Sequence, residues 1–216
     1  MTLETINKQT GDKPKLVIIW MHGLGADGND FAPVVPQFAI PNLPIKFIFP
    51  HAPKIPVTVN GGMVMRAWYD ITMMDIGKHA DKKGVLDSAE LIKELIQEQI
   101  DQGFSYEQIV LAGFSQGSAM ALHLVTTMPE KIAGVIALSG YLPIPESLSQ
   151  KINLSTPFFM GHGTQDPVVP FTLGTKSKQQ LEQFGYKIDW NTYPIQHGVS
   201  MEEINDIKQW LIKIFV

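Results

Sequence analysis

The sequence contains no cysteine. This absence excludes disulfide bonds, thiolate-ligated zinc, iron–sulfur clusters and thiol nucleophiles. Covalent catalysis by this chain would therefore have to use an oxygen or nitrogen nucleophile. A cysteine-free chain also agrees with a reducing compartment, although it would fold equally well elsewhere.

The chain also lacks a surplus of basic residues. It has 17 lysines and arginines against 21 aspartates and glutamates, which gives a formal net charge of −4. A nucleic-acid-binding protein needs positive charge to neutralise phosphates, so we expect no nucleic-acid partner.

Long apolar runs are missing as well. Residues 1–15 are polar and mixed in charge, unlike the apolar stretch of a secretory signal. The apolar run at 16–21 has roughly a third of the length that a membrane-spanning helix needs. We therefore expect a cytoplasmic protein.

The residues that are present favour a single α/β domain over residues 1–216. The chain is 44% hydrophobic and 18% charged, which is typical of a folded domain with a full core. Short apolar runs alternate with helical patterns, and this alternation predicts a mainly parallel sheet with helices on both faces. We expect strands at 15–21, 45–49, 108–112, 135–139, 157–160 and 187–193, and helices at 84–102, at 118–127 and from Ser200 to the end.

One segment, residues 51–77, does not follow this alternation. It has two prolines, a Gly-Gly pair and four of the ten methionines, so we expect an irregular, mobile loop near the active site. Two interpretations of its methionines stay open: they mould to a flexible apolar ligand, or they fill the core. The low charge and apolar content of residues 56–76 raise the hypothesis of peripheral contact with a membrane.

The sequence GFSQG at 113–117 carries the strongest chemical signal. It follows an expected strand and precedes an expected helix, which is the context of a nucleophile elbow. In such an elbow the turn is so tight that Gly113 and Gly117 must lack side chains, and the hydroxyl of Ser115 is exposed. The alternative is a glycine-rich turn with a capping serine.

A nucleophilic serine needs a base, and the base needs an orienting carboxylate. Asp166 and His197 both follow expected strands, and the carboxyl ends of parallel strands meet at one edge of the sheet. The chain order Ser115, Asp166, His197 is the order of an α/β-hydrolase. His162, beside the acid loop, is the rival base, whereas His22 at the end of the first strand is expected to shape its loop.

The hydrolase chemistry also needs donors for an oxyanion. The backbone N–H of Gln116, directly after the nucleophile, is one candidate. The glycine-rich loop 22–28 offers the backbone N–H of Leu24 as the second. The histidines are not clustered and form no His-x-x-x-His pair, so we assign no metal.

Taken together, the motifs HGLGADG (22–28), GFSQG (113–117) and GHGTQDPVVP (161–170), with RAWYDI at 66–71, resemble the phospholipase/carboxylesterase family, which includes the acyl-protein thioesterases. The resemblance spans essentially the whole chain. It implies an α/β-hydrolase without a large cap domain, with Ser115, Asp166 and His197 as catalytic triad and with oxyanion donors at Leu24 and Gln116. It also implies hydrolysis of acyl esters and thioesters without a cofactor.

The resemblance further implies the kind of substrate: small acyl esters, lysophospholipids or acylated proteins. We expect an apolar channel for the acyl chain that involves Trp68, Ile71, Tyr141 and Val169. A homodimer is compatible with the resemblance. Two alternatives stay open, a general short-chain carboxylesterase and a catalytically silent α/β-hydrolase that binds a lipid or a partner protein.

Overall fold

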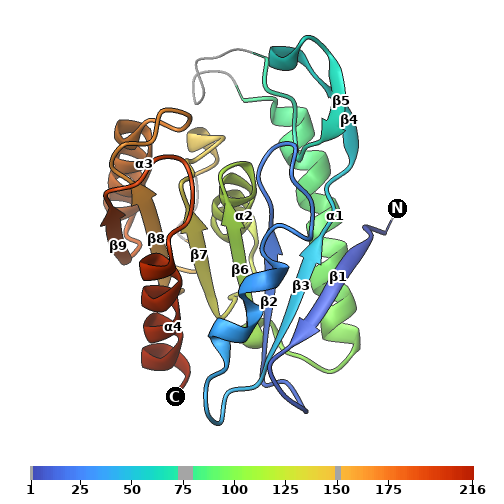
Figure 1. The fold of residues 1–216 in the computed structure, drawn as a ribbon, viewed down its shortest axis with the longest axis vertical. Coiled ribbons are helices and arrows are strands. Elements are labelled where there is room, and N and C mark those ends of the chain that lie inside the picture. The colour runs from blue at the N-terminus through green and yellow to red at the C-terminus, as the bar shows by residue number, and fades with distance from the viewer. Residues whose placement is uncertain (1, 73–79, 149–151) are drawn as a thin grey trace.

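The computed structural model describes residues 2–72, 80–148 and 152–216, and its centre is a seven-stranded sheet (Figure 1). The strand order is β1-β3-β2-β6-β7-β8-β9. β1 pairs antiparallel with β3, and the other neighbouring pairs are parallel. The predicted mainly parallel sheet is therefore confirmed. The strands are β1 (Thr5–Gln9), β2 (Leu16–Met21), β3 (Ile45–Pro50), β6 (Ile109–Phe114), β7 (Gly134–Leu138), β8 (Phe158–Gly163) and β9 (Ile188–Tyr193).

The central strands are apolar throughout because the sheet is covered on both faces. Alternate residues of β2 therefore enter two different cores: Val17 and Ile19 join one, Ile18 and Trp20 the other. The first core contains side chains of α1 (Lys82–Asp101), α2 (Gln116–Thr127) and α3 (Phe171–Phe184), and the second contains side chains of the 3-10 helix η1 (Ala32–Phe38) and of α4 (Met201–Phe215).

Figure 1 shows α4 in front of the sheet and α1 behind it, so the prediction of helices on both faces is confirmed. The sequence did not predict α3 or β1. Short 3-10 turns complete the described chain at η2 (Thr58–Asn60), η3 (Tyr106–Gln108) and η4 (Pro145–Ser147). Among the described residues, the helices are too short or too polar to cross a lipid bilayer.

The segment expected to be irregular contains a β-hairpin. β4 (Lys54–Val57) pairs antiparallel with β5 (Met63–Arg66), and both appear at the upper right of Figure 1. The turn between them is possible because Gly61 and Gly62 adopt φ values of 68° and 78°, which favour glycine. The expectation of irregular structure is thus wrong for residues 54–66. Residues 73–77 of the same segment lie outside the described residues.

Candidate active site

Ser115 lies on a sharp turn between β6 and α2. Its φ of 54° and ψ of −115° are unfavourable for a residue with a side chain, so the turn holds the serine under strain. A Cβ on Gly113 would overlap the carbonyl group of Gly117, and a Cβ on Gly117 would overlap the carbonyl oxygen of Met21. Glycine is therefore required on both sides of the serine, as the GFSQG pattern indicates.

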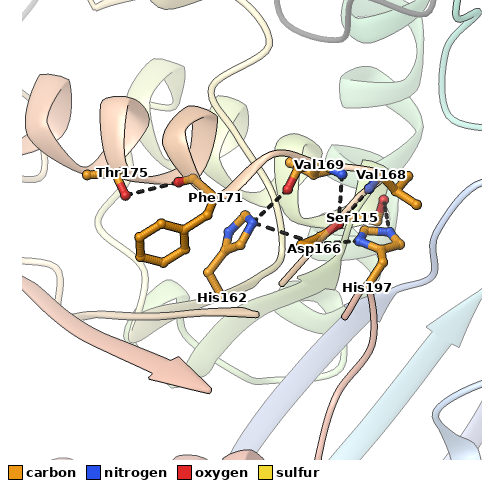
Figure 2. Close-up of polar contacts among 8 residues, drawn as sticks. All are labelled: Ser115, His162, Asp166, Val168, Val169, Phe171, Thr175 and His197. Atoms are coloured by element: carbon orange, nitrogen blue, oxygen red, sulfur yellow. Dashed lines mark hydrogen bonds and ion pairs between the residues drawn. The ribbon is translucent and has the colours of Figure 1, made fainter. Parts of the chain in front are cut away.

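The structure brings Ser115, His197 and Asp166 into a hydrogen-bonded row (Figure 2). His197 Nε2 lies 3.0 Å from Ser115 Oγ, and His197 Nδ1 lies 2.7 Å from Asp166 Oδ2. Asp166 follows β8, and His197 lies between β9 and α4. At these distances the imidazole can accept the serine proton while the carboxylate orients the ring.

Asp166 is held in place by its own loop. Its Oδ1 accepts hydrogen bonds from the backbone N–H groups of Val168 at 2.8 Å and Val169 at 2.9 Å. Its side chain is 0% exposed, so these bonds replace the water that the carboxylate has lost. The second oxygen, Oδ2, remains directed at His197.

His162, the rival base, lies on the other side of Asp166 from Ser115 (Figure 2). Its Nε2 donates to the carbonyl oxygen of Val169 at 2.9 Å and lies 3.6 Å from Asp166 Oδ2. Its ring packs against Gly174 of α3, where any Cβ would overlap it. Burial lowers the pKa of His162, which favours the neutral ring. The structure thus gives His162 a supporting position behind the acid loop.

The backbone around the two candidate oxyanion donors is tied to the segment after β5. The side chain of Gln116 accepts from the N–H of Trp68 at 2.9 Å and donates to the carbonyl oxygen of Tyr69 at 2.6 Å. The indole of Trp68 donates to the carbonyl oxygen of His22 at 2.9 Å. The N–H of Gly25 donates to the carbonyl oxygen of Arg66 at 2.8 Å. One short segment, residues 66–69, therefore holds the backbone around both candidate donors, and no pattern in the sequence predicts these contacts.

His22 is buried at the start of the candidate oxyanion loop. Its Nδ1 donates to the carbonyl oxygen of Gly23 at 2.7 Å, and its Nε2 accepts from the N–H of Ala52 at 3.1 Å. Burial lowers the pKa of His22, so the ring stays neutral and can accept at Nε2. This agrees with the loop-shaping role expected from its position.

A cavity of about 480 Å³ opens beside Ser115. Three of the four residues expected in the acyl channel line it, namely Ile71, Tyr141 and Val169. Trp68 does not line it, because the indole is 1% exposed and its N–H is bonded to His22. The wall also includes both candidate donor residues and several apolar side chains: Leu24, Val59, Phe114, Gln116, Pro167 and Val168.

Two tyrosines meet at the wall of this cavity. The hydroxyl oxygens of Tyr69 and Tyr141 lie 2.8 Å apart and are buried. Burial raises the pKa of both phenols, so both hydroxyls stay neutral and one donates to the other. No group of three histidine, aspartate or glutamate side chains that could hold a metal ion is found in the described part of the chain.

Comparison with known proteins agrees with this geometry. The family model of the phospholipase/carboxylesterases matches residues 3–215. Acyl-protein thioesterase 1 of Neurospora crassa is 40% identical over 90% of this chain and 84% of the relative. Acyl-protein thioesterase 1 of Candida albicans is 37% identical over 94% of each chain.

Solved structures show the same fold. The crystal structure of Arabidopsis thaliana SOBER1 is similar with a TM-score of 0.86 and 31% identity, over 93% of this chain and 99% of the other. Acyl-protein thioesterase 2 of Zea mays gives a TM-score of 0.85 at 27% identity, over 97% and 98%. The chain has a GFSQG elbow and hydrogen-bonded Ser, His and Asp side chains, and it is similar to these relatives over nearly its whole length. It therefore belongs to the phospholipase/carboxylesterase family of α/β-hydrolases.

Proposed function

We propose that the protein is a serine hydrolase that cleaves the ester or thioester bond of acyl substrates. The observation that carries the proposal is the row of hydrogen bonds from Ser115 Oγ through His197 to Asp166, at 3.0 Å and 2.7 Å. The named thioesterases among its relatives support the thioester as a substrate bond.

In the proposed reaction, Ser115 Oγ attacks the acyl carbonyl carbon while His197 Nε2 takes the hydroxyl proton. The carbonyl oxygen gains negative charge and is stabilised by the N–H groups of Leu24 and Gln116. Asp166 stabilises the imidazolium that forms. The tetrahedral intermediate then collapses: the bond to the alcohol or thiol breaks, and His197 returns the proton to the leaving atom.

Water completes the cycle. His197 removes a proton from a water molecule, whose oxygen attacks the acyl carbon, and the released serine regains that proton from the imidazolium. The products are a carboxylic acid and the free enzyme. The acyl chain would lie in the 480 Å³ cavity against Ile71, Tyr141 and Val169, whose side chains give it an apolar surface.

The proposed substrates are small acyl esters, lysophospholipids or acylated proteins. Peripheral contact with a membrane would suit the last two, and Met63 and Val64 at the start of β5 are 64% and 63% exposed. The homodimer expected from the resemblance stays a prediction, which sedimentation equilibrium would test.

The central test measures kcat/KM on esters and thioesters of graded acyl length for the wild type and for Ser115→Ala. We expect Ser115→Ala to lose at least about a thousandfold in kcat, since triad residues act as a unit. A fluorophosphonate should label the wild type at Ser115 and should fail to label the variant. Ser155→Ala, at an exposed serine, is the matched control. An unlabelled wild type, or full turnover by Ser115→Ala, would favour the silent binding protein instead.

A further inference from the structure

A second, smaller cavity adjoins His197. Its volume is about 300 Å³, and it opens between the loop before η1 and the start of α4. His197 and Asp30 line both cavities, whereas Ser115 lines the large one. Phe114 also lines both, so the two cavities adjoin along a wall that includes His197.

The chemistry of acyl transfer assigns different parts of a substrate to these spaces. The acyl carbonyl must lie between Ser115 Oγ and the oxyanion donors, all of which face the large cavity. The leaving atom must lie against His197 Nε2, because that nitrogen returns the proton to it. A leaving group that continues past the imidazole enters the small cavity.

We propose that the small cavity is a subsite for the leaving group and that it selects alcohols and thiols with an apolar body and a positive charge. This inference rests on the proposed function and names the substrate class of the same site. An acylated peptide with lysine or arginine beside the acylated residue has this chemistry.

The walls of the small cavity provide the apolar surface. The rings of Phe114 and His197 lie 4.7 Å apart between centroids, and Phe31 lies 5.8 Å from Phe114. Val199 and Met201 also line the cavity. The Met201 side chain is flexible and the residue is 53% exposed, so it can close over leaving groups of different shape.

Asp30 provides the preference for positive charge. Its carboxylate makes no hydrogen bond or ion pair with other described residues, and partial burial together with the charge of Asp27 raises its pKa. The lining includes no lysine or arginine among the residues that the structure describes. Asp30 is an exposed residue at the wall of the subsite, so its carboxylate would attract a cation there and repel an anion.

The test compares thioesters that share one acyl chain and differ in the thiol: thiocholine, its uncharged tert-butyl analogue and mercaptoethanesulfonate. All three form the same acyl-enzyme, so differences in kcat/KM arise in acylation. The measured quantity is kcat/KM for the cationic thioester divided by kcat/KM for the anionic one. Asp30→Asn should lower this ratio by about tenfold relative to the wild type, since close charges at a protein surface interact by this order of magnitude. Asp12→Asn, at an exposed loop, changes the net charge equally and should leave the ratio unchanged.

A second pair of variants tests the apolar wall. Met201→Ser should lower kcat/KM for the tert-butyl thiol relative to ethanethiol by about fivefold, because apolar contact is lost. Leu86→Ser is the matched control, since Leu86 is also an exposed apolar residue in the first turns of a helix, at 54% exposure.

Three results would overturn the inference. Either the ratio stays at the wild-type value in Asp30→Asn, or it falls equally in Asp12→Asn, or Met201→Ser alters the preference for acyl length instead of the preference for the thiol. If the wild type hydrolyses all the thioesters with equal kcat/KM, the proposed subsite is wrong but the proposed hydrolase function stands. A folded wild type that hydrolyses none of the thioesters overturns the proposed function together with it.

Discussion

Gln116 has two functions in the proposed mechanism, one for its backbone and one for its side chain. The N–H would bind the oxyanion, and the amide group bonds the backbone of Trp68 and Tyr69. Because the side chain is 2% exposed and both its oxygen and its nitrogen are bonded, it fixes where the N–H points. We therefore regard Gln116 as a positioning residue as well as a donor.

Gln116→Glu tests this role, since a carboxylate can accept from Trp68 but cannot donate to Tyr69. We expect kcat to fall by about ten- to a hundredfold, less than the loss of a whole oxyanion donor, with little change in KM. Steady-state kinetics with one ester would measure this effect. Gln97→Ala, at a surface position of α1, is the control and should retain wild-type kcat. An increase in KM with unchanged kcat would contradict the positioning role.

At this scale the sequence predicted three residues that the structure joins by hydrogen bonds, Ser115, Asp166 and His197, but not the contacts that hold their surroundings in place. The spacing of GFSQG identifies Ser115 because only glycine tolerates the contacts on either side of it. The Gln116 side chain bonds to backbone atoms of residues 68 and 69. Every residue has such backbone atoms, so the sequence pattern cannot predict these contacts. The prediction that Trp68 lines the acyl channel is wrong, because its indole is buried and its N–H donates to the carbonyl oxygen of His22, at the start of the candidate oxyanion loop.

The β4–β5 hairpin is the element that joins substrate access to the catalytic centre. Its end at Arg66 accepts a hydrogen bond from Gly25 of the candidate oxyanion loop, and Val59 and Asn60 beside its turn line the large cavity. Met63 and Val64 expose apolar side chains at the start of β5. A lipid surface that these residues contact would therefore lie near the mouth of the acyl cavity.

The double variant Met63→Ser with Val64→Ser tests the membrane hypothesis. We expect co-sedimentation with phosphatidylcholine vesicles to fall severalfold, because two exposed apolar side chains are removed from the contact. Activity on a short, water-soluble ester should stay within about twofold of the wild type, since surface substitutions of this kind change stability little. Leu86→Ser on α1 is the control. Equal vesicle binding by wild type and double variant, or no binding by either, would contradict the hypothesis.

The elements that the sequence did not predict share a weak hydrophobic pattern. α3 buries only Gly174, Ser177 and Leu181, so it has no apolar stripe at helical spacing. Gly174, a residue that disfavours helices, is needed there because His162 packs against it. β1 is a polar edge strand whose place is decided by pairing with β3. The central strands β2, β6 and β7 were predictable because burial on both faces makes them apolar almost throughout. β9 is half-buried and mixed in polarity.

For the whole molecule, buried titratable groups make stability depend on pH in two opposing ways. Burial lowers the pKa values of His22, His123 and His162, to about 4 for His123. The unfolded chain then binds more protons as the pH falls below 6.5, and stability is lost. Glu203 acts oppositely: it is 0% exposed, and burial raises its pKa to about 8.

Glu203 lies in the first turn of α4, where its N–H donates at 3.1 Å to the side-chain oxygen of Ser200, the N-cap residue. Its carboxyl group is turned inward against Gly161 and has no hydrogen-bond partner among the described residues. The unfolded chain loses this proton near pH 4.5, whereas the native protein keeps it to about pH 8. The free energy of unfolding should therefore fall as the pH rises between these values.

Glu203→Gln removes this dependence and keeps the shape of the side chain. The free energy of unfolding of the variant should rise relative to that of the wild type as the pH rises from 5 to 8. The expected difference is a few kcal/mol, because each unit of the pKa shift of Glu203 is equivalent to about 1.4 kcal/mol. Urea denaturation at several pH values measures the difference. Glu202→Gln, at the exposed neighbouring position, should give a curve parallel to that of the wild type. A parallel curve for Glu203→Gln would show that Glu203 ionises normally.

Because His197 lines both cavities, the proposed subsite also has a consequence for the order of events. A leaving group in the small cavity can depart while the acyl chain stays covalently bound in the large one. The vacated space then admits the next nucleophile directly beside the imidazole. Water is one such nucleophile, and an added alcohol that fits the small cavity is another. Hydrolysis and acyl transfer to that alcohol would therefore compete for a single acyl-enzyme, and the ratio of acid to new ester would fall as the alcohol's concentration rises.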